Sequence, residues 1–77
     1  MTICLHVVWR GDDWNAVVAG AAEPIASGGN KDALVQCACA LARNGNGEVH
    51  VYGKSDELEM IYAYREGIEQ KHGSRID

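Results

Sequence analysis

The sequence predicts a single α+β domain, in which a three- to four-stranded antiparallel sheet packs on one helix and a short helix follows near the C-terminus. Three segments support this prediction. Residues 3–9 are rich in β-forming side chains, residues 32–43 are alanine-rich with apolar side chains at helical spacing, and residues 48–52 alternate in polarity. The 77 residues leave room for one domain, at 1–72, with a frayed tail at 73–77.

The first half of the chain predicts a β-hairpin followed by an edge strand. Residues 3–9 and 14–19 have the composition of strands, and residues 10–13 form the turn between them. Residues 21–26 are expected to form a short third strand. Because Pro24 cannot donate a hydrogen bond to a central ladder, this strand belongs at an edge of the sheet.

The helix at 32–43 has the clearest boundaries in the sequence. Ser27 or Asn30 supplies its N-cap. Arg43 in the last turn and the glycines of residues 44–47 end it. The apolar stripe expected to face the sheet consists of Leu34, Cys37, Ala38 and Leu41.

The second half predicts one clear strand and one ambiguous segment. Val49 and Val51 lie on one face of a half-buried strand at 48–52, and residues 53–56 form a turn. From residue 55 onwards two patterns overlap. Leu58, Ile61, Tyr62 and Ile68 fit a helix, whereas Leu58, Met60, Tyr62 and Tyr64 fit a strand. We favour the short helix, although Gly67 weakens a long one.

The charge balance argues against direct nucleic-acid binding. Eleven acidic and seven basic residues give a net charge of −4, and the basic residues are scattered singly along the chain. An acidic protein is better suited to meet a basic surface on another protein, including one that itself binds nucleic acid.

The apolar and cysteine content indicates a cytoplasmic protein. The apolar run at 33–42 is broken by Gln36 and too short to cross a membrane. Three cysteines, an odd number in apolar surroundings, favour small buried thiols in a reducing compartment. The N-terminal residues lack the basic stretch and apolar run of a signal peptide, so we expect cytoplasmic localisation.

The cysteines do not predict a metal site or a cofactor. Cys4 and His6 point to one face of a strand, a suitable spacing for two ligands. Cys37 and Cys39, however, lie about 200° apart around a helix and cannot hold one ion together. We therefore expect no metal and no cofactor.

The histidines do not predict an enzyme. His6, His50 and His72 have no serine or cysteine arranged beside them as a nucleophile, and strand histidines next to valines are typically half-exposed sheet residues. We therefore expect no catalytic residues.

The order of short motifs resembles a family of small uncharacterised bacterial domains. The residues that carry the resemblance are His6-Val-Val, Trp14 with Val17, Asp32-Ala-Leu, Leu41-Ala-Arg-Asn44 and Glu48-Val-His-Val-Tyr-Gly-Lys54. The resemblance covers residues 5 to 56 and implies a sheet backed by one helix, with no established activity. This chain departs from the family pattern at Trp9, where proline is usual, and at Asp13, where glycine is usual.

A looser likeness, in size, charge and element order, is to small phage-encoded anti-CRISPR proteins. We therefore expect a non-catalytic protein-binding inhibitor or regulator, encoded by a mobile element and directed at a nucleic-acid-handling complex. Its expected contact residues are Trp9, Arg10, Asp12, Asp13, Asp56, Glu57, Glu59, Tyr62 and Tyr64. One alternative is a housekeeping homodimer of the uncharacterised family, with the small helix residues seating the second copy. A small metal-binding protein or enzyme is the least favoured.

Overall fold

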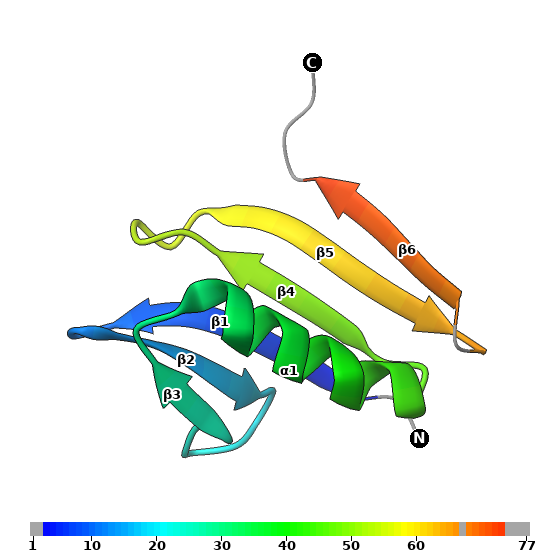
Figure 1. Cartoon of the computed structure of the whole chain (residues 1–77), viewed down its shortest axis with the longest axis horizontal. Coiled ribbons are helices and arrows are strands. Elements are labelled where there is room, and N and C mark those ends of the chain that lie inside the picture. The colour runs from blue at the N-terminus through cyan, green and yellow to red at the C-terminus, as the bar shows by residue number, and fades with distance from the viewer. Residues whose placement is uncertain (1–2, 67, 74–77) are drawn as a thin grey trace.

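The protein forms one six-stranded sheet with a single helix across one face (Figure 1). A computed structural model describes residues 3–66 and 68–73, without the side chains of residues 72 and 73. The elements in chain order are β1 (Cys4–Arg10), β2 (Asp13–Val18), β3 (Ala26–Gly28), α1 (Lys31–Asn44), β4 (Glu48–Tyr52), β5 (Leu58–Arg65) and β6 (Ile68–Gly73). This confirms the α+β class, but the sheet has more strands than predicted.

The sheet is mixed, so the prediction of a wholly antiparallel sheet is wrong. The strand order is β3-β2-β1-β4-β5-β6, and the central pair β1 and β4 runs parallel. All other neighbours are antiparallel. A parallel pair needs a long crossover. Here α1 carries the chain back along the sheet, so β4 starts at the same end as β1 (Figure 1).

The predicted C-terminal helix is also wrong, because the chain forms the β5–β6 hairpin there. Met60, Tyr62 and Tyr64 alternate along β5 and pack against or within the core, with Tyr64 only 1% exposed. A strand buries this period-two set on one face. Of the predicted frayed tail, residue 73 ends β6, and residues 74–77 lie outside the described part of the chain.

The N-terminal hairpin is confirmed, and the edge strand is displaced. Arg10 pairs with Asp13 across a two-residue turn that begins with Gly11. Gly11 has φ 63°, a left-handed conformation that glycine adopts without strain. The edge strand β3 begins at residue 26, where the predicted strand was to end.

The helix matches its predicted position and cap, but not its predicted buried stripe. The side chain of Asn30 accepts a hydrogen bond from the Ala33 amide at 3.2 Å, so Asn30 is the N-cap. The helix buries Leu34, Ala38 and Ala42. Cys37 and Leu41 are exposed, so both were wrongly expected in the core. The buried residues recur at four-residue spacing, and Cys37 and Leu41 both lie on the same side of that stripe.

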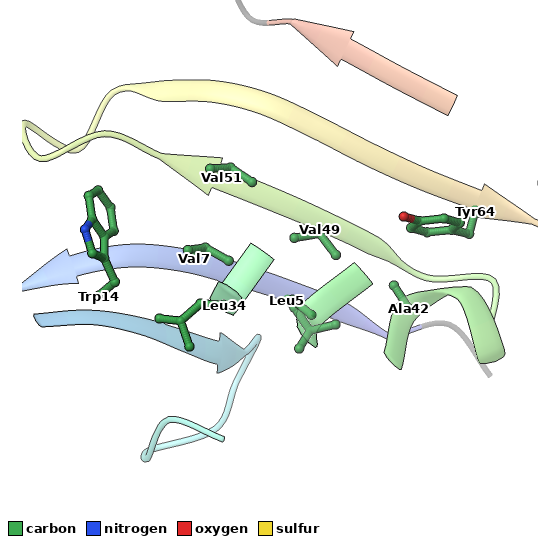
Figure 2. Close-up of a cluster of buried hydrophobic side chains, with 9 residues drawn as sticks. Leu5, Val7, Trp14, Leu34, Ala42, Val49, Val51 and Tyr64 are labelled. Atoms are coloured by element: carbon green, nitrogen blue, oxygen red, sulfur yellow. The ribbon is translucent and has the colours of Figure 1, made fainter. Parts of the chain in front are cut away.

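The core lies between α1 and the middle of the sheet (Figure 2). Leu5 and Val7 of β1 lie beside Val49 and Val51 of β4, all at most 5% exposed. Trp14 and Tyr64 close the two ends of this cluster. Ala38 and Ala42 are both fully buried, and their small side chains let the helix backbone come close to the sheet.

A Gly47→Ala substitution should destabilise the fold by about 1–3 kcal/mol, because the new methyl group would collide with the backbone carbonyl of Ile3. Gly47 also accepts a hydrogen bond from the Tyr64 amide and donates one to Ala42. The matched control is Gly28→Ala in β3, where the added methyl group meets no atom within 4 Å. Urea denaturation measures the free energy of unfolding of both variants. Equal stability of the two variants would show that this close approach is not required.

Candidate functional site

Two turns that are distant in sequence meet at one end of the sheet. Because β1 and β4 run parallel, the β1–β2 turn and the β4–β5 turn both follow the C-terminal end of a central strand (Figure 1, left). Lys54 in the second turn places its Nζ 4.5 Å from the centre of the Trp9 ring at the end of β1. We call this surface the acidic end; its exposed carboxylates are Asp12, Asp13, Asp56, Glu57 and Glu59.

The carboxylates of the acidic end differ in how they are held. Glu59 accepts a hydrogen bond from Lys31 Nζ at 2.5 Å, and Glu57 Oε1 accepts one from the Ser55 amide at 3.1 Å. The carboxylates of Asp12, Asp13 and Asp56 make no hydrogen bond or ion pair with other described residues. These three aspartates are therefore free to meet a partner.

Trp9 lies between the core and the surface of the acidic end. Its ring is half-buried and packs edge-on against Trp14, with 5.1 Å between ring centres. Lys31 Nζ lies 4.6 Å from the centre of the Trp14 ring. Each of the two tryptophan rings therefore has one lysine ammonium group over it. Arg10, the neighbour of Trp9, is exposed. Trp9 thus contributes to packing and remains partly accessible.

The two predicted tyrosines do not belong to this surface. Tyr64 is 1% exposed, and its hydroxyl donates a 2.6 Å hydrogen bond to Glu69. The Tyr64 backbone amide donates a hydrogen bond to the Gly47 carbonyl, so Tyr64 lies at the opposite end of the sheet. Tyr62 is half-buried against the core, with Lys71 Nζ 6.0 Å from its ring centre. Tyr64 therefore supports the fold, and neither tyrosine joins the acidic end.

A second group of chemically active side chains lies on the sheet face opposite α1, which no other described element covers. His6 is the register partner of His50, and their ring centres are 5.2 Å apart. Cys4 Sγ lies 3.7 Å from His6 Nε2. Each of the three residues has a ligand atom within 4.8 Å of the others, and all three are half-buried. We call these residues the Cys-His cluster.

Two neighbours hold the imidazoles of the Cys-His cluster. Glu48 Oε1 lies 2.9 Å from His50 Nε2 and accepts its hydrogen bond when that nitrogen is protonated. Tyr52 stacks on His6, with 5.7 Å between ring centres and 15° between ring planes. Both rings are therefore restrained from one side.

Burial sets the protonation of Cys4 and His6. Burial lowers the pKa of His6, and neighbouring His50 lowers it further. Burial raises the pKa of the Cys4 thiol, and the charge of Glu48 adds to the effect. Near neutral pH, His6 is thus a neutral imidazole and Cys4 a protonated thiol. A protonated thiol is a poor nucleophile, so the cluster lacks an activated cysteine.

A model of the bacterial family described as "Uncharacterized protein conserved in bacteria (DUF2188)" matches residues 5–64. The chain belongs to this family. No curated protein and no solved structure was found to match it. The range shared with this bacterial family includes the acidic end, His6 and His50, whereas Cys4 and β6 lie outside it. The description of the family assigns no activity.

Sequence reasoning placed Cys4 and His6 on one strand face but did not bring His50 to them. A signal is visible in retrospect: Leu5-His6-Val7 and Val49-His50-Val51 have the same pattern of a histidine between two buried aliphatic residues. That pattern indicates a shared face only once the two strands are known to be neighbours. Cys39 is half-buried on α1, and the side chain of His72 lies outside the described residues.

The His6 imidazole of the metal-free protein should titrate below the ordinary histidine pKa of about 6.5. His50→Gln removes the neighbouring charge, so it should shift the His6 pKa back toward that value. Since the unfolded chain then binds more protons than the folded one below pH 6.5, His6 reduces stability as the pH falls through this range. Proton NMR titration of the imidazole measures the pKa. A value at or above 6.5 would contradict the burial of His6.

None of the helices that the structure describes is long and apolar enough to span a membrane.

Proposed function

We propose that this protein is a small non-catalytic inhibitor or regulator that binds a basic surface of another protein through its acidic end. The observation that carries the proposal is the convergence of the β1–β2 and β4–β5 turns. The two turns bring five exposed carboxylates to one end of the sheet, around a half-buried tryptophan.

The composition of the acidic end fits a docking surface. Carboxylates that have no internal partner steer an oppositely charged surface toward them and favour the correct orientation. Trp9 offers a large amphipathic ring that is already held by Trp14, so little side-chain entropy is lost on binding. Arg10 adds a cation beside these carboxylates and allows the surface to select a partner of mixed charge.

A nucleic-acid-handling complex is the class of partner that best fits this surface. Proteins that bind nucleic acid present clustered lysine and arginine side chains to the phosphates. An acidic end docked on such a cluster would block it sterically and electrostatically. We propose that the gene belongs to a mobile element and that the partner is a complex such as a CRISPR effector, which this protein inhibits by occlusion.

Charge reversal at the acidic end should abolish partner capture. The test variant is Asp12→Lys/Asp56→Lys, in which both carboxylates lack internal partners. The control is Glu23→Lys/Glu66→Lys, which changes the net charge equally at two other exposed positions. Each pair contains one residue with positive φ, Asp56 at 65° and Glu66 at 54°. Any backbone strain that lysine introduces at such a position therefore affects both variants alike.

The immobilised proteins would be exposed to nuclease-treated bacterial lysate, and the bound proteins quantified by mass spectrometry. We expect basic proteins that are enriched on the wild type and on the control to be depleted at least about tenfold on the test variant. Equal capture by all three would remove the acidic end from the mechanism.

A second candidate function, a housekeeping homodimer, is favoured by the outer surface of α1. Leu41 is 43% exposed, and Cys37 and Ala40 beside it are exposed and uncharged. Small side chains on a helix allow a second helix to pack closely against it. This surface would then join two copies, leaving both acidic ends open.

If α1 forms a dimer interface, Leu41→Glu should convert a dimer into a monomer, because it places a charge in the apolar contact. Asp32→Lys, at an exposed position about 180° around the same helix from Leu41, is the control and should remain dimeric. Sedimentation equilibrium measures both masses. A wild-type protein that remains monomeric at about 100 μM, where even a weak dimer would be populated, would rule out this candidate.

A further inference from the structure

We propose that the Cys-His cluster binds one divalent transition-metal cation of the zinc type, with Cys4, His6 and His50 as its three protein ligands. The proposal rests on the placement of one sulfur and two imidazoles on the uncovered face, with ligand atoms within 4.8 Å of one another. It does not rest on the proposed function, although the hollow beside the cluster extends to Arg10 and Asp56 at the acidic end.

The spacing of the donor atoms is close to that of a tetrahedral site. With Zn–S near 2.3 Å and Zn–N near 2.05 Å, a sulfur and a nitrogen on one tetrahedral ion are separated by about 3.6 Å. Cys4 Sγ and His6 Nε2 are 3.7 Å apart. These two atoms can therefore share an ion almost without moving. The ligand nitrogen of His50 lies within 4.8 Å of both atoms and has to move closer to bind the same ion.

The backbone fixes the three ligands before any ion arrives. Cys4 and His6 are two residues apart on β1, and His50 is the register partner of His6 on β4. Leu5, between Cys4 and His6, and Val49, next to His50, are fully buried on the other face. Because the face of each side chain follows from the strand pleat, moving a ligand away would require disruption of the core. The site is therefore preorganised.

Glu48 orients His50 in the way that carboxylates orient metal-binding histidines. When Nε2 of His50 donates to Glu48, the Nδ1 lone pair remains available for a cation. Glu48 is also the register partner of Cys4, so its negative charge lies near the ion without needing to bind it. This arrangement gives a reason for a carboxylate beside His50 on β4, where the alternate residues are buried valines.

The donor set selects the class of cation. One thiolate and two imidazoles suit Zn²⁺, Co²⁺ and copper, whereas Mg²⁺ and Ca²⁺ prefer oxygen ligands. Binding must displace the thiol proton: Cys–SH and M²⁺ give Cys–S–M⁺ and H⁺, with no change in oxidation state. The two imidazoles bind as neutral ligands and release no proton when they are already unprotonated.

Three protein ligands leave one position of a tetrahedral ion open. His6 and Tyr52 also line a hollow of about 360 Å³ on the same face, together with Val8, Arg10 and Asp56. A water molecule or a small exogenous ligand could reach the ion from this hollow. Structural zinc sites use four protein ligands, so an open position is the pattern of a site that exchanges a ligand.

The test uses the tag-free, chelator-treated full chain and the metal ions alone. Calorimetric titration with Zn²⁺ should give one ion per chain. Titration with Co²⁺ should give the visible bands of a tetrahedral ion and a thiolate-to-cobalt charge-transfer band. Cys4→Ser should remove the charge-transfer band, and His6→Gln and His50→Gln should each weaken Zn²⁺ binding at least about tenfold. Glu48→Ala should weaken binding roughly 10–100-fold.

Cys37→Ser on the exposed surface of α1 is the matched control and should leave stoichiometry and affinity unchanged. Circular dichroism and thermal unfolding of every metal-free variant confirm that the fold is retained; a variant that fails to fold is replaced by Cys4→Ala or His50→Asn at the same position. The proposal is wrong if the wild type binds no Zn²⁺ at about 100 μM, or if folded ligand variants bind as tightly as the wild type. One ion per two chains would equally contradict a site completed within a single chain.

Discussion

The parallel pairing of β1 with β4 is the constraint on which the other features of this molecule depend. It joins the N-terminal hairpin to the C-terminal strands and places Leu5 and Val7 beside Val49 and Val51 in the core. The same register puts His6 beside His50 on the opposite face. Had β4 run the other way, its following turn would lie at the other end of the sheet, away from the β1–β2 turn. Neither the acidic end nor the Cys-His cluster would then exist in its present form.

The helix makes this pairing possible, and its composition follows from that role. A parallel connection must return the chain along the sheet before the next strand begins. The 14 residues of α1 return the chain in this way. The helix backbone lies close to the sheet because the side chains buried between them, Ala38 and Ala42, are small. At the end of the helix, Gly47 lies against the backbone of Ile3, and the Glu48 amide bonds the Ile3 carbonyl at 2.8 Å. The crossover therefore ends where β1 begins.

Local patterns predicted most of the elements, and long-range geometry accounts for the errors. Val49 and Val51 indicated a strand because alternation is a local property, and Asn30 could be recognised as a cap for the same reason. The direction of β4 relative to β1 cannot be inferred from the residues of either strand alone. The segment after residue 55 satisfied two periods at once, since Leu58 and Tyr62 fit both a helix and a strand. The sheet edge offered by β4 and the buried position of Tyr64 decide in favour of the strand.

The candidate site was only half predictable, for the same reason. Asp12, Asp13, Asp56 and Glu57 were expected to contact a partner from charge and turn chemistry alone, and turns do lie at the surface. That the two turns are neighbours, however, depends on strand order. Cys4 and His6 share a strand face by simple alternation, but the third ligand comes from a strand more than 40 residues later in the chain. The matching patterns around His6 and His50 indicate that contact only once β1 and β4 are known to be neighbours.

The two surfaces share the same two strands, and this gives them a physical connection. A cation held by Cys4, His6 and His50 would cross-link β1 to β4 on the face that α1 leaves uncovered. Since an ion that binds only the folded chain stabilises it by RT ln(1 + [M]/Kd), the cross-link would strengthen the parallel pairing itself. That pairing sets the separation of the two turns at the acidic end. Metal occupancy would therefore hold together the two strands that carry both turns of the acidic end.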